Sequence, residues 1–257
     1  MKAVILAGGY GTRITEETYL KPKPMIEIGG NPILWHIMKT YSHYGINDFV
    51  ICCGYKGYMI KEYFANYFLH MSDVTFNLKN NKMEVHHKFA EPWTVTLSDT
   101  GLDTMTGGRL KRIKEYVKDE SFCFTYGDGV SDVDISASIQ FHKSHGKTVT
   151  FTGVHPSGRF GEFQEKNNQV YSFEEKPDKG KAFINGGYMV FNNNLLNYLT
   201  SDESCDFEFN ALEKLAKSGE VMVYKHEGNW ACMDHERDVL HLNQLWSDER
   251  AFWKKWK

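Results

Sequence analysis

Hydrophobic residues in the first quarter of the chain follow two alternating patterns. Residues 2–6 and 49–53 are continuous, β-branched apolar runs of the kind that form buried strands. The segment between them has apolar residues at helical spacing, closed by Gly45, and residues 56–68 predict a second helix. Asn31 and Pro32 fit the cap and first position of the earlier helix. This strand–helix alternation predicts an α/β fold with a mostly parallel, Rossmann-like sheet and helices on both faces.

The pattern then loosens and becomes mixed. We expect strands at residues 83–89, 122–126, 148–154, 189–191 and 221–225, and helices at 104–118, 135–145, 207–217 and 239–256. Residues 161–164 and 170–173 predict a hairpin, so a smaller mixed region should accompany the main sheet. The last helix carries Trp253 and Trp256 on an apolar stripe, which indicates either core packing or a subunit contact. We expect one domain over residues 1–257.

The composition and net charge of the chain limit the classes of protein to which it can belong. The chain is 41% hydrophobic and 25% charged, as in an ordinary soluble globular protein. A net charge of −3 argues against bulk nucleic-acid or anionic-membrane binding, which needs an excess of basic surface. The first apolar run is too short for a signal peptide, and no segment reaches the length of a membrane span. The five cysteines form no C-x-x-C pair, so we expect free thiols in the cytoplasm.

The first predicted strand runs directly into a glycine-rich loop, Leu6-Ala7-Gly8-Gly9-Tyr10-Gly11-Thr12-Arg13. Its glycines supply backbone freedom and bare N–H groups, which together can bind an anion. The loop is not a dinucleotide fingerprint, because Ile14 stands where the third glycine belongs, and no Gly-Lys-Ser/Thr follows as in a P-loop. The alternative is a tight strand-to-helix turn that binds nothing. Lys23 favours the phosphate-binding interpretation, because Pro22 and Pro24 hold it on a stiff stretch of chain.

Two acidic residues follow other predicted strands. Asp128 lies between Gly127 and Gly129 at the end of an apolar strand, where ligands gather in parallel sheets. Asp234 follows Trp230 in the second half of the chain. Such carboxylates could hold a divalent cation against phosphates, whereas a plain surface turn is the alternative for an Asp-Gly pair. A further helix start with paired glycines, Gly107 and Gly108, could form a second wall of the same pocket.

Taken together, these motifs resemble the signature of the sugar-1-phosphate nucleotidyltransferases, in the same order and over nearly the whole chain. The segments 91–97 and 104–109 most resemble the branch that transfers CMP from CTP to glucose 1-phosphate with Mg²⁺ as cofactor. That resemblance implies a cytoplasmic enzyme that forms a hexamer and supplies CDP-glucose for lipopolysaccharide O-antigen. The same reaction with dTTP or UTP, and a non-catalytic regulatory relative, stay open as alternatives.

The resemblance also implies roles for individual residues. Residues 1–130 would form the nucleotide-binding part and residues 131–257 the part that binds the sugar phosphate. Catalytic roles fall on Arg13, Lys23 and Asp128, and the metal ligands would be Asp128 and Asp234. His235 departs from the family pattern, where many relatives carry a small residue beside the second aspartate. Nucleotide binding is implied for Leu6, Ala7, Gly8, Gly9, Tyr10, Gly11, Thr12, Arg13, Lys23, Thr104, Gly108, Arg109 and Asp128, and sugar-phosphate binding for Glu175, Lys176, Asn185, Gly186 and Gly187.

Overall fold

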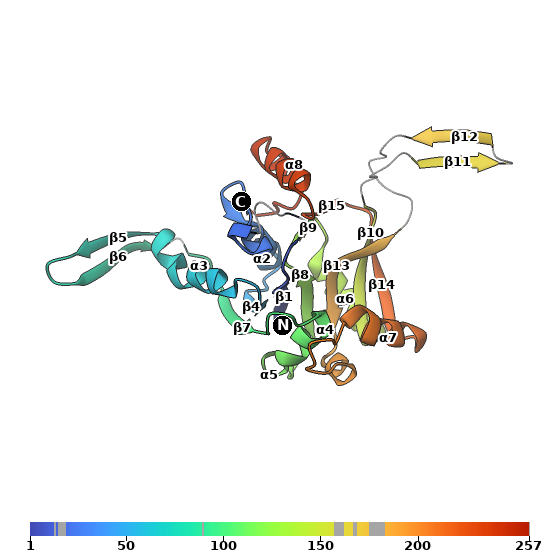
Figure 1. Ribbon diagram of the computed structural model, residues 1–257, viewed down its shortest axis with the longest axis horizontal. Coiled ribbons are helices and arrows are strands. Elements are labelled where there is room, and N and C mark those ends of the chain that lie inside the picture. The colour runs from blue at the N-terminus through green and yellow to red at the C-terminus, as the bar shows by residue number, and fades with distance from the viewer. Residues whose placement is uncertain are drawn as a thin grey trace.

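A seven-stranded sheet forms the centre of the computed structural model (Figure 1), in the order β14-β10-β13-β8-β1-β4-β7. The structure describes residues 1–12, 14, 19–88, 90–156, 162–166, 169–174 and 183–256. All neighbouring pairs in the sheet are parallel except those of β13, which runs antiparallel to both β10 and β8. The strands are β1 Ala3–Ala7, β4 Asp48–Cys53, β7 Thr94–Asp99, β8 Phe122–Tyr126, β10 Val149–Val154, β13 Ile184–Phe191 and β14 Val221–His226.

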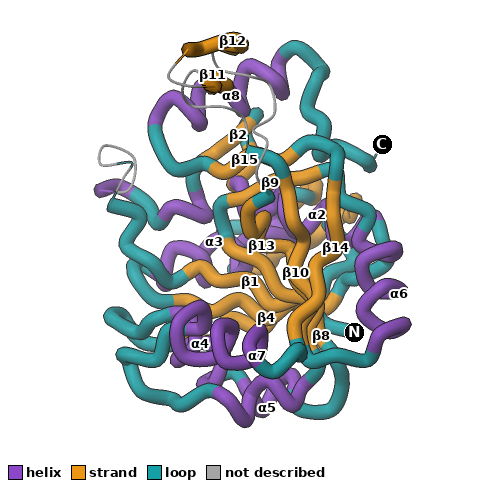
Figure 2. Tube along the Cα trace, turned by 90° about the vertical axis from the view of Figure 1, so that its right-hand side faces the viewer, coloured by secondary structure: helices purple, strands orange, loops and turns teal. Residues whose placement is uncertain are grey.

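Helices cover both faces of this sheet, as the alternation of strands and helices predicted. Because successive side chains of a strand point to opposite faces, β1 contributes Ile5 to one buried cluster and Val4 and Leu6 to the other. The first cluster includes residues of α2 and α8, whereas α4, α5 and α7 lie together on the opposite side (Figure 2). The helices are α2 Ile33–His43, α3 Gly57–His70, α4 Thr106–Arg112, α5 Lys114–Val117, α6 Ile135–His145, α7 Glu213–Lys217 and α8 Glu236–Ser247.

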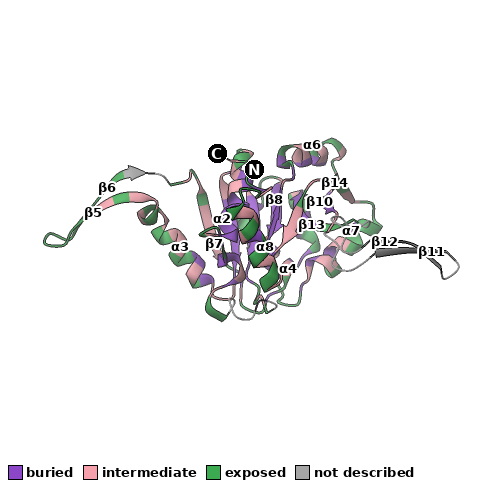
Figure 3. Ribbon diagram, turned by 90° about the horizontal axis from the view of Figure 1, so that it is seen from above, coloured by how far each residue is buried: buried purple, intermediate pink, exposed green. Residues whose placement is uncertain are grey.

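Smaller antiparallel pairs surround the main sheet and confirm the mixed character of the rest of the chain. A hairpin of β5 Ser72–Asn77 and β6 Lys82–Lys88 extends from the end of α3, with many exposed residues, while the central strands are buried (Figure 3). The predicted second hairpin is present as β11 Glu162–Lys166 and β12 Gln169–Glu174. Two short pairs form near the loops, β2 Glu27–Ile28 with β3 Asn31–Pro32, and β9 Gly129–Ser131 with β15 Trp230–Cys232.

Several short helical turns complete the described chain. A 3₁₀ turn spans Lys23–Met25 and another spans Asn193–Tyr198. A π-helical turn over Glu208–Leu212 runs directly into α7, so the predicted helix at 207–217 is not regular throughout. The predicted helix at 104–118 is likewise divided into α4 and α5. Within the described part of the chain, no helix combines the length and apolar character that crossing a membrane requires.

Two of the differences from the predicted helix boundaries follow from contacts elsewhere in the fold. Asn31 and Pro32 pair with β2, so α2 begins only at Ile33. The predicted terminal helix ends at Ser247, close to Glu249, which adopts a left-handed backbone conformation with φ of 58°. The chain then folds back, and Trp253 is completely buried with its indole N–H donating to His36 Nδ1 at 3.3 Å. Trp253 therefore belongs to the core and is not a subunit contact.

Candidate active site

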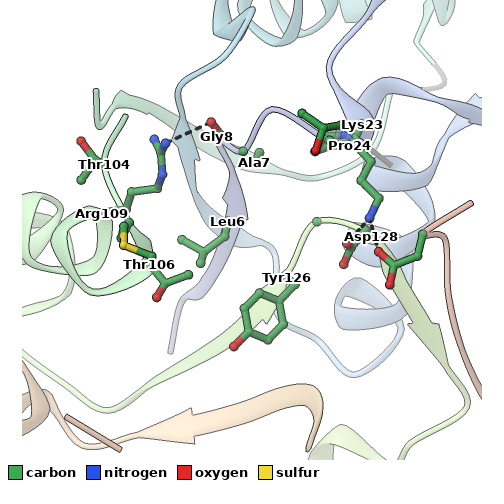
Figure 4. Close-up of a pocket in the computed structure, with 16 residues that line it drawn as sticks. Leu6, Ala7, Gly8, Lys23, Pro24, Thr104, Thr106, Arg109, Tyr126 and Asp128 are labelled. Carbon is green, nitrogen blue, oxygen red and sulfur yellow. Dashed lines mark hydrogen bonds and ion pairs between the residues drawn. The ribbon is translucent and has the colours of Figure 1, made fainter. Parts of the chain in front are cut away.

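A cleft lies at the carboxyl ends of β1 and β8 (Figure 4). It is a cavity of about 370 Å³. This is the position at which parallel α/β sheets place their ligands. The lining residues come from the glycine loop, the start of α4 and the two acidic segments: Leu6, Ala7, Gly8, Gly9, Gly11, Thr12, Lys23, Pro24, Thr104, Met105, Thr106, Arg109, Tyr126, Gly127, Asp128 and Asp234.

One end of the cleft carries a cluster of three charges. Lys23 Nζ lies 2.6 Å from Asp128 Oδ2 and 2.7 Å from Asp234 Oδ1, and all three side chains are largely buried. Burial alone would lower the pKa of Lys23. The charge of Asp128 and the hydrogen bonds from both carboxylates outweigh that effect and raise its pKa above the ordinary value. Lys23 is therefore a fixed cation at neutral pH.

Separate strands bring the two aspartates together. Asp128 follows β8 of the main sheet, whereas Asp234 follows β15, which pairs with β9 beside it. The N–H of Met233 donates to the Asp128 carbonyl at 2.8 Å and ties the two segments to each other. The carboxylate of Asp238, in the first turn of α8, accepts the N–H groups of Asp234 and His235 at 2.9 and 2.8 Å. His235 thus belongs to the cap of α8, and the backbone that carries Asp234 is fixed.

The side chains of the two aspartates lie close enough together to hold a divalent cation. Ligand atoms of Asp128, Cys232 and Asp234 lie within 4.8 Å of one another. Two carboxylates against one ammonium leave a net negative charge there, and Mg²⁺ typically takes one or two carboxylates together with phosphate oxygens. Burial, followed by the charges of the two aspartates, raises the pKa of the Cys232 thiol, which therefore stays protonated. The two carboxylates fit Mg²⁺, and the neutral thiol does not add to that ligand set.

The glycine loop passes along the wall of the cleft. Gly8, Gly9, Gly11 and Thr12 line it, and Gly11 adopts a φ of 66° that favours glycine. Tyr10, in contrast, does not line the cleft, because its hydroxyl donates to Asp103 Oδ1 at 2.6 Å and its ring lies against Tyr55. Arg13, the remaining loop residue with an expected role, lies outside the described residues.

A hydrogen bond from Arg109 fixes the backbone of this loop at Gly8. Its guanidinium donates to the carbonyls of Gly8, Cys53, Gly101 and Leu102 and to Thr100 Oγ1, at 2.6 to 3.3 Å. A β-carbon on Gly8 would lie 2.2 Å from that guanidinium, so only glycine fits this close approach. The resemblance implied a place for Arg109 near the base and ribose. The structure places it on the wall of the cleft, with its donors directed at the protein's own backbone.

Other expected residues lie just outside the cleft lining. Gly108 is buried behind it, and its N–H donates to the Cys205 carbonyl at 2.9 Å. Asn185, Gly186 and Gly187 form part of β13, where Gly187 has a φ of 82° and packs against the ring of Tyr126. The Gly186 carbonyl accepts from the indole N–H of Trp230 at 2.8 Å. Glu175 and Lys176 lie outside the described residues, so the structure says nothing of them.

Three side chains near the cleft had no assigned role in the sequence analysis. Tyr126 and Thr106 line it, and both donate hydrogen bonds to Glu208, Thr106 at 2.8 Å. Tyr126 could have been noticed as the last residue of an apolar strand at the ligand edge. Glu208 carries no signal in the sequence, because its relation to the cleft depends on a contact with a residue far away in the chain.

Comparisons with known proteins agree on one kind of protein. The sequence profile described as "Nucleotidyl transferase" matches residues 2–249. The chain is 60% identical over 258 aligned residues to the glucose-1-phosphate cytidylyltransferase of Salmonella typhimurium, with both chains fully covered. Two solved structures share the fold. HddC from Yersinia pseudotuberculosis has a TM-score of 0.68 at 20% identity, covering 95% of this chain and 99% of that one. A UDP-glucose pyrophosphorylase in complex with UDP-glucose has a TM-score of 0.67 at 14% identity, covering 97% and 99%.

Proposed function

This chain belongs to the nucleotidyl transferase family, and from that premise we propose that it transfers CMP from CTP to glucose 1-phosphate, giving CDP-glucose and pyrophosphate. The full-length identity of 60% to a glucose-1-phosphate cytidylyltransferase supports the choice of substrates. The observation that carries the proposal is the cluster of Lys23, Asp128 and Asp234 at one end of a cleft walled by the glycine loop.

The chemistry needs charge and positioning rather than a general base. A phosphomonoester has a second pKa near 6, so glucose 1-phosphate is largely a dianion at neutral pH and can attack without being deprotonated. Its oxygen forms the new bond to the α-phosphorus of CTP, and the bond from that phosphorus to the pyrophosphate oxygen breaks in line with it. The remaining difficulty is the repulsion between two polyanions and the negative charge that develops on the departing pyrophosphate.

The residues at the charged end would supply the electrostatic stabilisation that this reaction needs. Lys23 Nζ carries a positive charge on the wall of the cleft, and preorganised charges of this kind stabilise transferring phosphoryl groups. Asp128 and Asp234 would hold Mg²⁺, which when bound neutralises phosphate charge and polarises the reacting phosphorus. The backbone of the glycine loop, fixed by Arg109, would line the path of the triphosphate.

Roles on the sugar side follow from the family resemblance. Lys176, with Glu175, would bind the sugar phosphate, and Asn185, Gly186 and Gly187 would bind the glucose. Arg13 would add charge at the triphosphate. A cytoplasmic hexamer and a supply of CDP-glucose to lipopolysaccharide O-antigen rest on the same resemblance, and each stays a prediction.

The alternatives make different predictions. A non-catalytic relative would have little use for two converging carboxylates beside a buried lysine, and this cluster favours turnover. Transfer from dTTP or UTP would use the same charged end of the cleft and would differ only at the base.

A pyrophosphate-release assay separates these possibilities. The wild-type enzyme, glucose 1-phosphate and Mg²⁺ would be incubated with CTP, UTP, dTTP or GTP in turn. We expect release with CTP, its loss on addition of EDTA and its return with excess Mg²⁺. Release with UTP or dTTP in preference to CTP would reassign the nucleotide, and no release with any of the four would support the non-catalytic alternative.

A further inference from the structure

The wall of the cleft carries two hydroxyl groups that are directed at one carboxylate. Thr106 Oγ1 donates to Glu208 Oε2 at 2.8 Å, and the Tyr126 hydroxyl donates to Glu208 Oε1. Burial, followed by the charge of Glu208, raises the pKa of Tyr126 well above its ordinary value, so the phenol keeps its proton. Glu208 is the first residue of the π-helical turn, an irregularity that is often found at functional sites.

The hydroxyl hydrogen of Thr106 is therefore used within the protein and is not available to a ligand. A threonine hydroxyl has one hydrogen to donate and two lone pairs to accept with. The hydrogen is used on Glu208, and one lone pair accepts the N–H of Phe207 at 2.9 Å. Among the described residues, no further partner of this oxygen is present, so one lone pair stays available. Toward the cleft, Thr106 can act as an acceptor and cannot act as a donor.

The position of Thr106 places it near the base of a bound nucleotide. Figure 4 shows Thr104, Thr106 and Arg109 on one side of the cleft and Lys23 and Asp128 on the other, with Leu6 and Tyr126 between them. In the proposed reaction, Lys23 and the cation that Asp128 and Asp234 would bind hold the phosphates on their side, so the base is left with the side that Thr106 lines.

Several backbone carbonyls on this side already accept hydrogen bonds within the protein. A backbone carbonyl from the glycine loop or from residues 104–109 would be the other candidate acceptor for the base. The Gly8 carbonyl already accepts from both Arg109 and the N–H of Tyr55, which fills its two lone pairs. The carbonyls of Gly101 and Leu102 also accept from Arg109. The Thr106 oxygen is a side-chain acceptor on the same wall.

We propose that Thr106, oriented by Glu208, determines the nucleotide specificity by accepting a hydrogen bond from the exocyclic amino group of cytosine. The proposal rests on the proposed function and names the residue that selects its nucleotide. Cytosine donates at ring position 4, where uracil and thymine present a carbonyl oxygen. Against UTP or dTTP, the lone pair of Thr106 faces another lone pair. Its own hydrogen cannot turn to meet that carbonyl without leaving the carboxylate, and a polar mismatch of this type discriminates strongly.

Two variants of Thr106 test the proposal through a ratio of rates. Thr106→Val removes the oxygen at nearly constant shape, and Thr106→Ser keeps it. We expect the Val variant to lose kcat/KM with CTP by about tenfold or more, the equivalent of one hydrogen bond, with UTP little changed. The Ser variant should keep the wild-type ratio of CTP to UTP. An equal loss with both nucleotides in the Val variant would show that Thr106 has only a structural role and would overturn the proposal.

A variant of Glu208 tests the orientation separately. Glu208→Ala frees the Thr106 hydrogen to turn toward the cleft, so the preference for CTP should fall because UTP improves. An unchanged ratio would contradict the orienting role of Glu208. Failure of the proposed function itself is distinguishable, because the wild-type enzyme would then show no CTP preference before any variant is made.

Discussion

Among the single residues of the site, Lys23 has two electrostatic roles. In the absence of substrates it forms ion pairs with Asp128 and Asp234, and during the proposed reaction its charge faces phosphate. We predict that Lys23→Ala lowers kcat by roughly 10²–10³-fold, the loss seen when one preorganised charge-stabilising group is removed. Steady-state rates of pyrophosphate release measure this directly.

Lys21 provides a matched control for that variant. It also precedes a proline, but its ammonium pairs with Glu27 at 3.0 Å and it does not line the cleft. Lys21→Ala should therefore leave the rate close to that of the wild type. Near-native turnover in Lys23→Ala would make Lys23 a structural partner of the aspartates and remove it from the transfer step.

Arg109 is expected to act on stability more than on substrate affinity. Its planar guanidinium reaches five acceptors, which the single ammonium of a lysine cannot do. We predict that Arg109→Lys loses about 2–3 kcal/mol of stability, which lowers Tm by about 4–12 °C. Calorimetry checks this. An unchanged Tm with a large rise in the KM for CTP would instead assign Arg109 to the nucleotide.

The sequence predicted residues whose roles depend on local position and missed those whose roles depend on distant contacts. Gly8, Lys23 and Asp128 could be found because each lies next to a strand end or a stiff proline segment. Two acceptors of Arg109, the carbonyls of Gly8 and Cys53, lie far away in sequence, and so does the carboxylate that orients Thr106. Periodicity and spacing contain no information about such pairs.

At the scale of elements, prediction succeeded inside strands and helices and was less accurate at several of their ends. Helix α6 was predicted with its exact bounds, because Asp134 caps its start and Gly146 its end. The terminal helix was predicted too long because its apolar stripe continues past Ser247. The structure buries that stripe by folding the chain back onto α2, a tertiary arrangement that helical spacing does not reveal.

This docking of the chain end on α2 should make stability depend on pH. His36 is completely buried beside Trp253, its Nε2 lies 2.7 Å from the Ile28 carbonyl, and burial lowers its pKa to about 4. An unfolded histidine binds its proton near pH 6.5, so between these values only the unfolded chain takes it up. The stability contribution is fully present above about pH 6.5, and about 3 kcal/mol is lost as the pH falls to about 4.

Urea unfolding at pH 4 to 8 measures this dependence. His36→Gln removes the titrating group and should flatten the fall in unfolding free energy across that window, although the variant is less stable overall. If the unfolding free energies of the wild type and the variant fall in parallel as the pH is lowered, a group other than His36 causes the pH dependence.

At the scale of the whole molecule, the site joins the two halves of the chain. Lys23 and Asp128 belong to the part expected to bind nucleotide, and Asp234 belongs to the part expected to bind the sugar phosphate. The pairing of β9 with β15 and the bond from Met233 to Asp128 hold the halves at this point. We propose that both aspartates hold one cation between the two substrates.

A double-mutant cycle on the two aspartates tests that claim most directly. We would measure kcat/KM for Asp128→Asn, Asp234→Asn and the double variant with CTP, glucose 1-phosphate and Mg²⁺, using Asp119→Asn on the surface as the control. Each single variant should lose activity sharply, and the double variant should cost much less than the product of the two losses, because both residues hold the same ion. Losses that simply multiply, or activity that survives EDTA in the wild type, would contradict a shared metal site.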